Sequence, residues 1–202
     1  MRSKRVGDAF RWSYHGPRVV LNGARELSSV FRGGGLAEAI EPWMTCEGID
    51  DVPFEKIAAE GMKAVLFDLE NTLVPPGGPF TEDGRVIIGK ARAAGLAVGV
   101  VSNASAGWVR PALAAEGIPC IAPAGKPARK AFEDACTLLG VPVAEAAYVG
   151  DQVITDVLGS QRAGLRAVLV HPKYTKEFFS AKFQRAVAKI VVRLAGAQRR
   201  RN

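Results

Sequence analysis

Between residues 63 and 170, short apolar runs alternate with longer stretches that have one apolar face. Runs rich in Val, Leu and Ile predict buried strands, and stretches with helical spacing that end at a glycine predict helices. The predicted strands span residues 63–69, 96–101, 118–121, 146–149 and 165–170. The predicted helices span residues 82–94, 106–116, 128–139 and 153–163. This alternation predicts an α/β fold of βαβ units with a mainly parallel sheet.

Polar side chains stand at the carboxyl ends of four predicted strands, where open parallel sheets bind their ligands. In chain order these are Asp68 and Glu70, Ser102 and Asn103, Lys126, and Asp151. A carboxylate can attack a phosphoryl group, and a second one can transfer a proton at the leaving group. A lysine can neutralise phosphate charge, and a further carboxylate can bind Mg²⁺. The set therefore predicts metal-assisted phosphoryl transfer.

Each of these groups also has a plain structural interpretation. A strand-end Asp, Ser or Asn can cap a turn or a helix, and Lys126 can be a solvated surface lysine. Their order, with one group or pair after each successive strand, favours a joint site.

The same residues resemble the four motifs of the haloacid dehalogenase (HAD) superfamily of phosphatases. The matching segments are Asp68-Leu69-Glu70-Asn71-Thr72, Ser102-Asn103, Lys126-Pro127, and Gly150-Asp151 with Thr155-Asp156. The stretch from Gly150 to Gly164 is especially similar to the YqeG-type subgroup of the IIIA-type phosphatases. The resemblance covers roughly residues 40–195 and implies a Rossmann-like, three-layer sandwich.

The resemblance also implies Mg²⁺-dependent hydrolysis of phosphomonoesters through an aspartyl-phosphate. By this resemblance, Asp68 is the nucleophile and Glu70 is the acid/base. Substrate contacts are implied for Ser102, Asn103 and Lys126. Metal binding is implied for Asp68, Glu70 and Asp151, with Asp156 in support of the metal site. A eukaryotic branch of the family acts on phosphatidylglycerophosphate, which makes a phospholipid headgroup a candidate substrate.

Glu70 departs from the family pattern, which has Asp at this position. The backbone carbonyl that binds Mg²⁺ in the family is unaffected, but the acid/base carboxylate now stands one methylene further out. Because a displacement of about 1 Å can cost roughly 100-fold in rate, we expect a working but retuned or slow enzyme. The turnover of a Glu70→Asp variant tests this expectation.

The segments between these groups leave no room for a cap domain, because one helix, one strand and their turns occupy each. An open site can accept a bulky substrate, such as a lipid headgroup, a protein or an oligonucleotide end. The loop Pro75-Pro76-Gly77-Gly78-Pro79 follows the nucleophile and is either part of the entrance or a stiff connector.

The composition is that of a globular protein, with 48% hydrophobic residues and 23% charged residues among 202. No apolar run is long enough to cross a membrane. Three widely spaced cysteines argue against a disulfide framework and suit the cytoplasm. The only histidines are His15 and His171. Two histidines are few for a histidine-based zinc site and argue against a Ser-His-Asp triad.

The net charge of +7 is concentrated at the two ends of the chain. We predict a basic, partly disordered arm over residues 1–40, a phosphatase domain over 41–195 and a basic tail over 196–202. Near the C-terminus, helical spacing predicts an apolar face formed by Phe179, Phe183, Val187, Ile190 and Leu194. An adjacent basic stripe is formed by Lys182, Arg185, Lys189 and Arg193. The face can pack on the sheet, and the stripe can contact an anionic membrane peripherally.

Two alternatives stay open at this stage. The basic ends could bind nucleic acid or direct a phosphatase to nucleic-acid ends, although aromatic residues make up only 7% of the chain. Glu70 could also turn the site into a phosphate-binding regulator with weak or no turnover. The sequence does not determine the oligomeric state.

Overall fold

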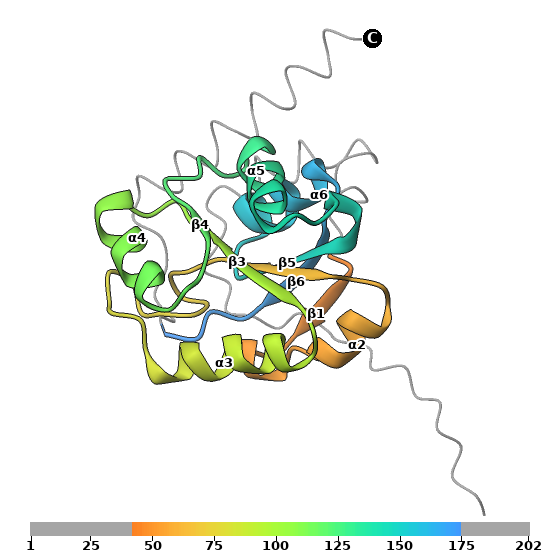
Figure 1. Cartoon of the computed structure of the whole chain (residues 1–202), viewed down its shortest axis with the longest axis horizontal. Helices are drawn as coiled ribbons and strands as arrows, with labels where there is room; N and C mark the ends of the chain where they lie inside the picture. Colours follow the sequence, from red (N-terminus) through yellow and green to blue (C-terminus); the bar gives the residue numbers. More distant parts are fainter. Residues whose placement is uncertain (1–41, 175–202) are drawn as a thin grey trace, which may run out of the picture.

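The computed structural model of the chain describes residues 42–174, which form one parallel sheet with helices on both faces (Figure 1). The order of the six strands in the sheet is β1-β6-β5-β2-β3-β4. The strands are β1 (Met44–Cys46), β2 (Ala64–Phe67), β3 (Ala97–Val101), β4 (Cys120–Ile121), β5 (Ala146–Gly150) and β6 (Arg166–Val170). All neighbouring strands pair in parallel, which confirms the predicted α/β fold with a parallel sheet.

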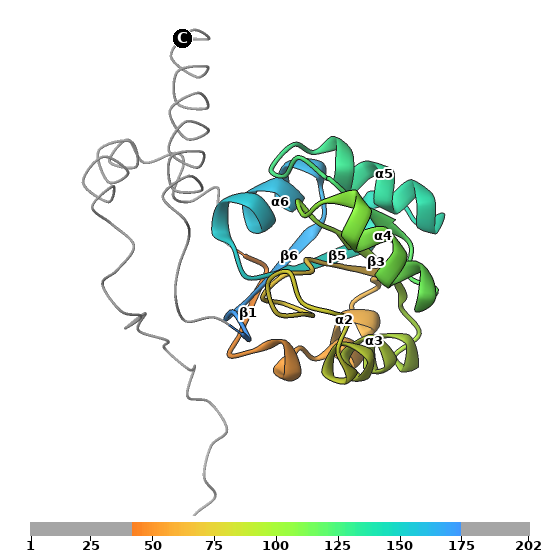
Figure 2. The ribbon, with the colours of Figure 1, turned by 90° about the vertical axis from the view of Figure 1, so that its left-hand side faces the viewer.

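The helices form the two outer layers of the sandwich. They are α2 (Phe54–Ala59), α3 (Glu82–Ala93), α4 (Ala106–Ala115), α5 (Lys130–Leu139) and α6 (Gly159–Ala163), with short turns η1 (Ile49–Asp51) and η2 (Val143–Glu145) and a π-helix η3 (Val153–Leu158). Figure 2 shows α2 and α3 on one face of the sheet and α5 and α6 on the other. One α-helix separates β2 from β3 and one separates β3 from β4, so no cap domain is inserted there.

The central strand β2 explains why its sequence is apolar at every position. Successive side chains of a strand point to opposite faces. Val65 and Phe67 pack into the core cluster on the α2 and α3 face, while Ala64 and Leu66 pack into the cluster on the α5 face. Both faces of the strand are therefore buried, as is usual for a parallel sheet covered by helices on each side.

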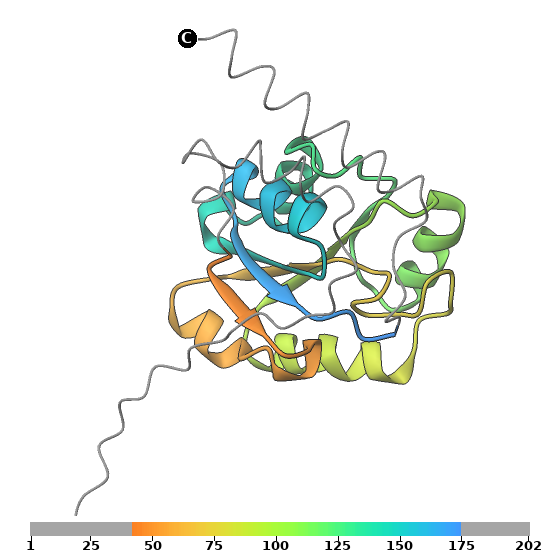
Figure 3. The same ribbon diagram turned by 180° about the vertical axis from the view of Figure 1, so that it is seen from behind.

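One strand and one α-helix were not predicted from the sequence. Strand β1 has only three residues, which are partly exposed, and pairs with β6 at the edge of the sheet (Figure 3). Helix α2 has six residues, of which Phe54 and Ile57 are buried. Both elements are too short to give a readable apolar period.

The predicted helix over residues 153–163 is two elements. Its first part is the π-helix η3, in which the Val157 amide donates to the Gln152 carbonyl at 3.2 Å. Helix α6 then ends at Gly164, which has a left-handed φ of 96° and serves as the predicted C-cap. The wider turn carries Asp156, and π-turns of this kind are frequent at functional sites.

The predicted basic arm, the apolar face and basic stripe of the C-terminal segment, and the basic tail lie outside the described residues. The division into arm, domain and tail therefore stays a prediction. Among residues 42–174, no helix has both the length and the apolar character needed to cross a bilayer.

Candidate active site

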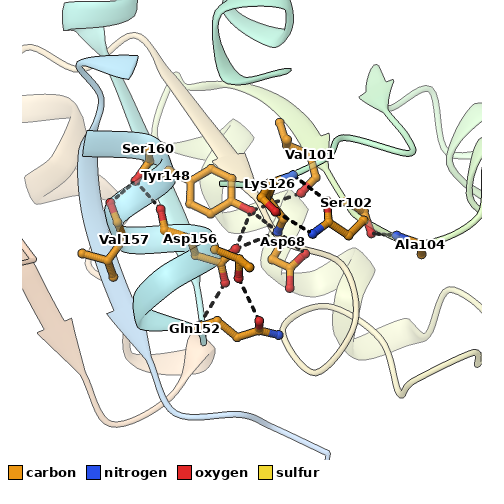
Figure 4. Close-up of polar contacts among 12 residues, drawn as sticks. Asp68, Val101, Ser102, Ala104, Lys126, Tyr148, Gln152, Asp156, Val157 and Ser160 are labelled. Carbon is orange, nitrogen blue, oxygen red and sulfur yellow. Dashed lines mark hydrogen bonds and ion pairs between the residues drawn. The ribbon is translucent and has the colours of Figure 1, made fainter. Parts of the chain in front are cut away.

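Strand order and register bring the predicted polar groups to one edge of the sheet. Phe67 pairs with Val149 of β5 and with Val100 of β3, so these three strands end almost level. The chain then continues into Asp68 after β2, Ser102 after β3 and Asp151 after β5. The loop after β4 supplies Lys126, and Figure 4 shows its side chain among those of Asp68, Asp156 and Tyr148.

Lys126 is the centre of the site. Its Nζ lies 2.7 Å from Asp68 Oδ1, 2.7 Å from Asp156 Oδ1 and 2.7 Å from the Tyr148 hydroxyl. The side chain is only 2% exposed, so all three N–H groups of the ammonium are donated to buried partners. Burial disfavours the charged form, but the charges of Asp156 and Asp68 outweigh it and raise the pKa of Lys126. Lys126 is therefore a fixed positive charge, not a solvated surface lysine.

Asp68 has the environment of a carboxylate held for reaction. Its amide donates to the Val149 carbonyl at 2.9 Å, which continues the β2–β5 pairing to the site. Burial raises the pKa of Asp68 to about 6; the nearby Asp156 charge adds to this and Lys126 opposes it. At neutral pH the carboxylate is thus mostly ionised, which is the state that its predicted role as a nucleophile requires.

Asp156 binds Lys126 directly. Its predicted role, support of a metal site, stays a prediction. Its Oδ2 accepts from the Gln152 amide at 3.0 Å, while its Oδ1 accepts from Lys126. The carboxylate packs against the Cα of Gly150, and a Cβ at this glycine would overlap it. The glycine before Asp151 is therefore needed to make room for Asp156.

Tyr148 belongs to the site and was missed in the sequence analysis. Its ring packs edge-on against Phe132, with 4.9 Å between ring centroids. Its hydroxyl lies 3.1 Å from the Val101 carbonyl and 3.2 Å from Asp156 Oδ1. Burial, followed by the charges of Asp156 and Asp68, raises the pKa of Tyr148 well above its ordinary value, so the hydroxyl keeps its proton. The sequence signal that could have identified it is the hydroxyl-bearing side chain two positions before Gly150. Residues two apart in a strand lie on the same face, so this side chain lies on the face that Gly150 shares.

The acidic groups of the site fit a divalent cation. Asp68, Asp151 and Asp156 each offer one oxygen, and these oxygens lie within 4.8 Å of one another. Asp151 Oδ1 is buried and has no hydrogen-bond partner among the described residues. Burial, together with the charges of Asp156 and Asp68, raises the pKa of Asp151 to about 8. Clustered carboxylate oxygens are ligands that hard divalent cations prefer, and a cation here would compensate the unpaired Asp151 oxygen.

Comparison with known proteins agrees with this geometry. A family model described as HAD-hydrolase-like matches residues 123–194. Over 140 residues the chain is 33% identical to the probable phosphatase YqeG of Bacillus subtilis (strain 168), and the match covers 68% of this chain and 81% of that protein. The chain belongs to the HAD superfamily. It is a phosphatase of this family, as the sequence resemblance implied.

Several solved structures are similar to this HAD phosphatase. A HAD-superfamily hydrolase from Ehrlichia chaffeensis matches with a TM-score of 0.43 and 13% identity, covering 65% of this chain and 98% of that chain. The cobalt-bound form of the deoxy-D-mannose-octulosonate 8-phosphate phosphatase from Haemophilus influenzae matches with a TM-score of 0.42 and 18% identity, covering 68% and 91% of the two chains.

Ser102 and Asn103 stand at the end of β3 but make different contacts. Ser102 is buried, and its Oγ accepts from the Ala104 amide at 3.1 Å. The Asn103 side chain binds the main chain of Lys126: its Oδ1 accepts from the Lys126 amide at 2.8 Å and its Nδ2 donates to the Lys126 carbonyl at 3.2 Å. In this HAD phosphatase Asn103 thus connects the end of β3 to the Lys126 loop, and the substrate contacts predicted for Ser102 and Asn103 stay predictions.

Glu70 is not one of the three carboxylates that cluster in the HAD site. Its Oε1 accepts from the Gly77 amide at 2.7 Å, so its side chain is directed to the loop that follows. The residue after it, Asn71, has a left-handed φ of 64°, which lets the chain turn immediately after Asp68 and Glu70. The roles predicted for Glu70 as acid/base and as a backbone ligand of the metal stay predictions.

Proposed function

We propose that this HAD phosphatase is an Mg²⁺-dependent phosphomonoesterase that acts through an aspartyl-phosphate on Asp68. The observation that carries the proposal is the arrangement of Asp68: its buried carboxylate is bound by Lys126 and lies beside Asp151, which has an unpartnered oxygen. Asp68, Asp151 and the backbone carbonyl of Glu70 would hold the metal. When bound, it supplies positive charge that stabilises the phosphoryl oxygens.

In the first step an oxygen of Asp68 attacks phosphorus, and a bond between them forms as the bond from phosphorus to the ester oxygen breaks. Glu70 donates its proton to the departing oxygen, so the alcohol leaves neutral. Lys126 contributes a fixed positive charge next to the reacting carboxylate. Ser102, at the end of β3, would contact the phosphoryl group.

In the second step a water molecule attacks the phosphorus of the aspartyl-phosphate. The Glu70 carboxylate accepts a proton from this water as the new oxygen–phosphorus bond forms. The bond between Asp68 and phosphorus breaks, inorganic phosphate leaves, and Asp68 is again a carboxylate. Both Asp68 and Glu70 end the cycle as they began it.

The substrate we propose is a bulky phosphomonoester, with a phospholipid headgroup such as that of phosphatidylglycerophosphate as the first candidate. Two features support it: the described part of the chain has no cap domain between β2 and β4, and both ends of the sequence are basic. Basic segments attract anionic membranes, which would bring an open site close to a lipid substrate. Peripheral contact with an anionic membrane in the cytoplasm is part of this proposal.

The test is phosphate release by the full chain with Mg²⁺, with Asp68→Asn as the control. The panel holds an aryl phosphate, phosphatidylglycerophosphate in mixed micelles and a 5′-phosphorylated oligonucleotide. We expect wild type to release phosphate and Asp68→Asn to fall to the background rate. Preference for the oligonucleotide would replace the lipid proposal with a nucleic-acid role. Binding of a phosphate analogue with no release from any substrate would favour a phosphate-binding regulator.

A further inference from the structure

The loop after Glu70 closes back on Glu70 itself. Glu70 and Val74 form an isolated bridge, and the Asn71 amide donates to the Val74 carbonyl at 2.8 Å. Further along, the Gly77 amide reaches back over seven residues to Glu70 Oε1, at 2.7 Å. The Glu70 side chain is therefore bound across a small loop at the edge of the site.

The outer side of this loop is held by the segment after β6. The Lys173 amide donates to the Asn71 carbonyl at 2.7 Å, and the Tyr174 hydroxyl lies 3.3 Å from the Leu73 carbonyl. The Lys173 ammonium forms ion pairs with Asp50 at 3.0 Å and Asp83 at 3.2 Å. These contacts fix the main chain beside Glu70, so the position of its carboxylate depends on the side-chain torsions and on the contact with Gly77.

We propose that the Gly77 N–H positions the Glu70 carboxylate for proton transfer, which makes Gly77 a positioning residue; this inference rests on the proposed function. Glu has one more rotatable bond than Asp, and a free carboxylate on that longer stem would occupy several orientations. The hydrogen bond from Gly77 selects one of them through Oε1 and leaves Oε2 for the proton transfer. The longer side chain is thus matched to the loop over residues 75–79.

Gly77 suits this task because of its conformation. Its φ is 64°, and a Cβ built on it meets no atom within 4 Å. Asn tolerates this left-handed region and keeps the N–H, so Gly77→Asn retains the hydrogen bond. Pro fixes φ near −65° and has no N–H, so Gly77→Pro removes it. The pair of variants separates the hydrogen bond from the presence of a side chain.

The experiment compares kcat/KM for two substrates, an aryl phosphate with a well-stabilised leaving group and an alkyl phosphate with a poor one. For each substrate, kcat/KM reports the steps up to departure of the leaving group. Only the alkyl phosphate needs strong help from a general acid. We expect Gly77→Pro to lower kcat/KM for the alkyl phosphate by about 10- to 100-fold and for the aryl phosphate by less than about threefold. Gly77→Asn should restore most of the alkyl activity.

Gly61→Pro is the matched control. Gly61 also has a left-handed φ, of 89°, and its amide donates to the Ala58 carbonyl at 3.0 Å. It lies before β2, at the opposite end of the strand from Asp68. Its replacement repeats the loss of a glycine and of an N–H without touching the site, so the ratio of the two kcat/KM values should stay at the wild-type value.

Glu70→Asp gives an independent test that does not alter the loop. Its carboxylate is one methylene shorter, about 1.5 Å, and does not reach the Gly77 N–H while the main chain stays in place. We expect the alkyl phosphate to be hydrolysed more slowly than by wild type, again with a smaller effect on the aryl phosphate. Faster alkyl turnover by Glu70→Asp would overturn the positioning role, even if Gly77→Pro does not fold.

The outcomes for the two proposals are distinct. If wild type hydrolyses the aryl phosphate and Asp68→Asn does not, the proposed function holds. An equal loss on both substrates in Gly77→Pro, or no loss on either, then overturns the role of Gly77 alone. Absence of Asp68-dependent hydrolysis overturns the proposed function and the inference with it.

Discussion

Lys126 carries a positive charge that two buried carboxylates share. Asp68 and Asp156 both bind its ammonium, and a third carboxylate, Asp151, lies close by with an unpartnered oxygen. Buried charges are stable only when they are paired and hydrogen-bonded. Three carboxyl groups around one ammonium leave the site short of positive charge. A divalent cation would supply this missing charge, and protonation of Asp151 is the alternative without a cation.

This competition between proton and cation predicts proton release on metal binding. Because the pKa of Asp151 is raised to about 8, the group holds a proton at pH 7 and would have to lose it to bind Mg²⁺. We expect about one proton to be released per Mg²⁺ at pH 7 and almost none at pH 9. Titration calorimetry in two buffers of different ionisation enthalpy measures the number. Asp151→Asn should release none, and a pH-independent value in wild type would contradict the prediction.

At the scale of elements, the N-terminus of α3 joins the loop that follows Asp68 to the rest of the fold. Thr81 is the N-cap of α3, and its Oγ1 accepts from the Gly84 amide at 3.2 Å. The same oxygen lies 3.4 Å from the Leu73 carbonyl and 3.3 Å from the Tyr174 hydroxyl. One side chain thus connects a helix end, the loop that carries Glu70 and the segment after β6.

Removal of this cap should destabilise the fold measurably. N-cap replacements by Ala cost about 1 kcal/mol, with a range of roughly 0.5–2 kcal/mol, and Thr81 makes further contacts. We expect Thr81→Ala to lower the free energy of unfolding by about 1–2 kcal/mol in urea titrations. Thr81→Ser keeps the cap oxygen and should lie within about 0.5 kcal/mol of wild type. Equal losses in the two variants would assign the effect to the missing methyl group.

At the scale of the whole molecule, the acidic site opposes folding when no metal is bound. The folded protein keeps the Asp151 proton up to a pKa of about 8, whereas the unfolded chain loses it near 3.8. Between these values the unfolded state binds fewer protons than the folded state. The stability of the metal-free protein therefore falls as the pH rises from about 4 to about 8, and the raised pKa of Asp68 acts in the same direction up to about 6.

Asp151→Asn should remove the main part of this pH dependence. In the presence of a chelator, we expect the variant to gain in Tm relative to wild type as the pH is raised from 5 to 8. Mg²⁺ should raise the Tm of wild type at pH 8 and leave Asp151→Asn almost unchanged, because only wild type binds the ion well. Thermal unfolding followed by circular dichroism measures both effects. A parallel pH profile for the two proteins would show that Asp151 is not the group responsible.

The sequence by itself determined the order of the main elements and most of the residues at the site. Apolar runs and glycine-terminated helices are local patterns, so β2, β3, β5 and β6 were predicted within a few residues. The strand ends of a parallel sheet meet at one edge, so position along the chain already placed Asp68, Ser102, Lys126 and Asp151 together. The short edge strand β1 was not predicted, because three residues are too few for a readable pattern and the strand is defined by its pairing with β6.

Only the tertiary structure decided which side chains are partners. Tyr148 binds Lys126 from β5, which β3 and β2 separate from β4 in the sheet, and Asn103 binds the main chain of Lys126 from the end of β3. Asp156 reaches Lys126 because a π-turn and Gly150 make room for it. Glu70 is bound by Gly77, a contact set by how one loop closes. Such pairings depend on strand order, register and loop closure, which a local pattern of hydrophobic and polar residues does not encode.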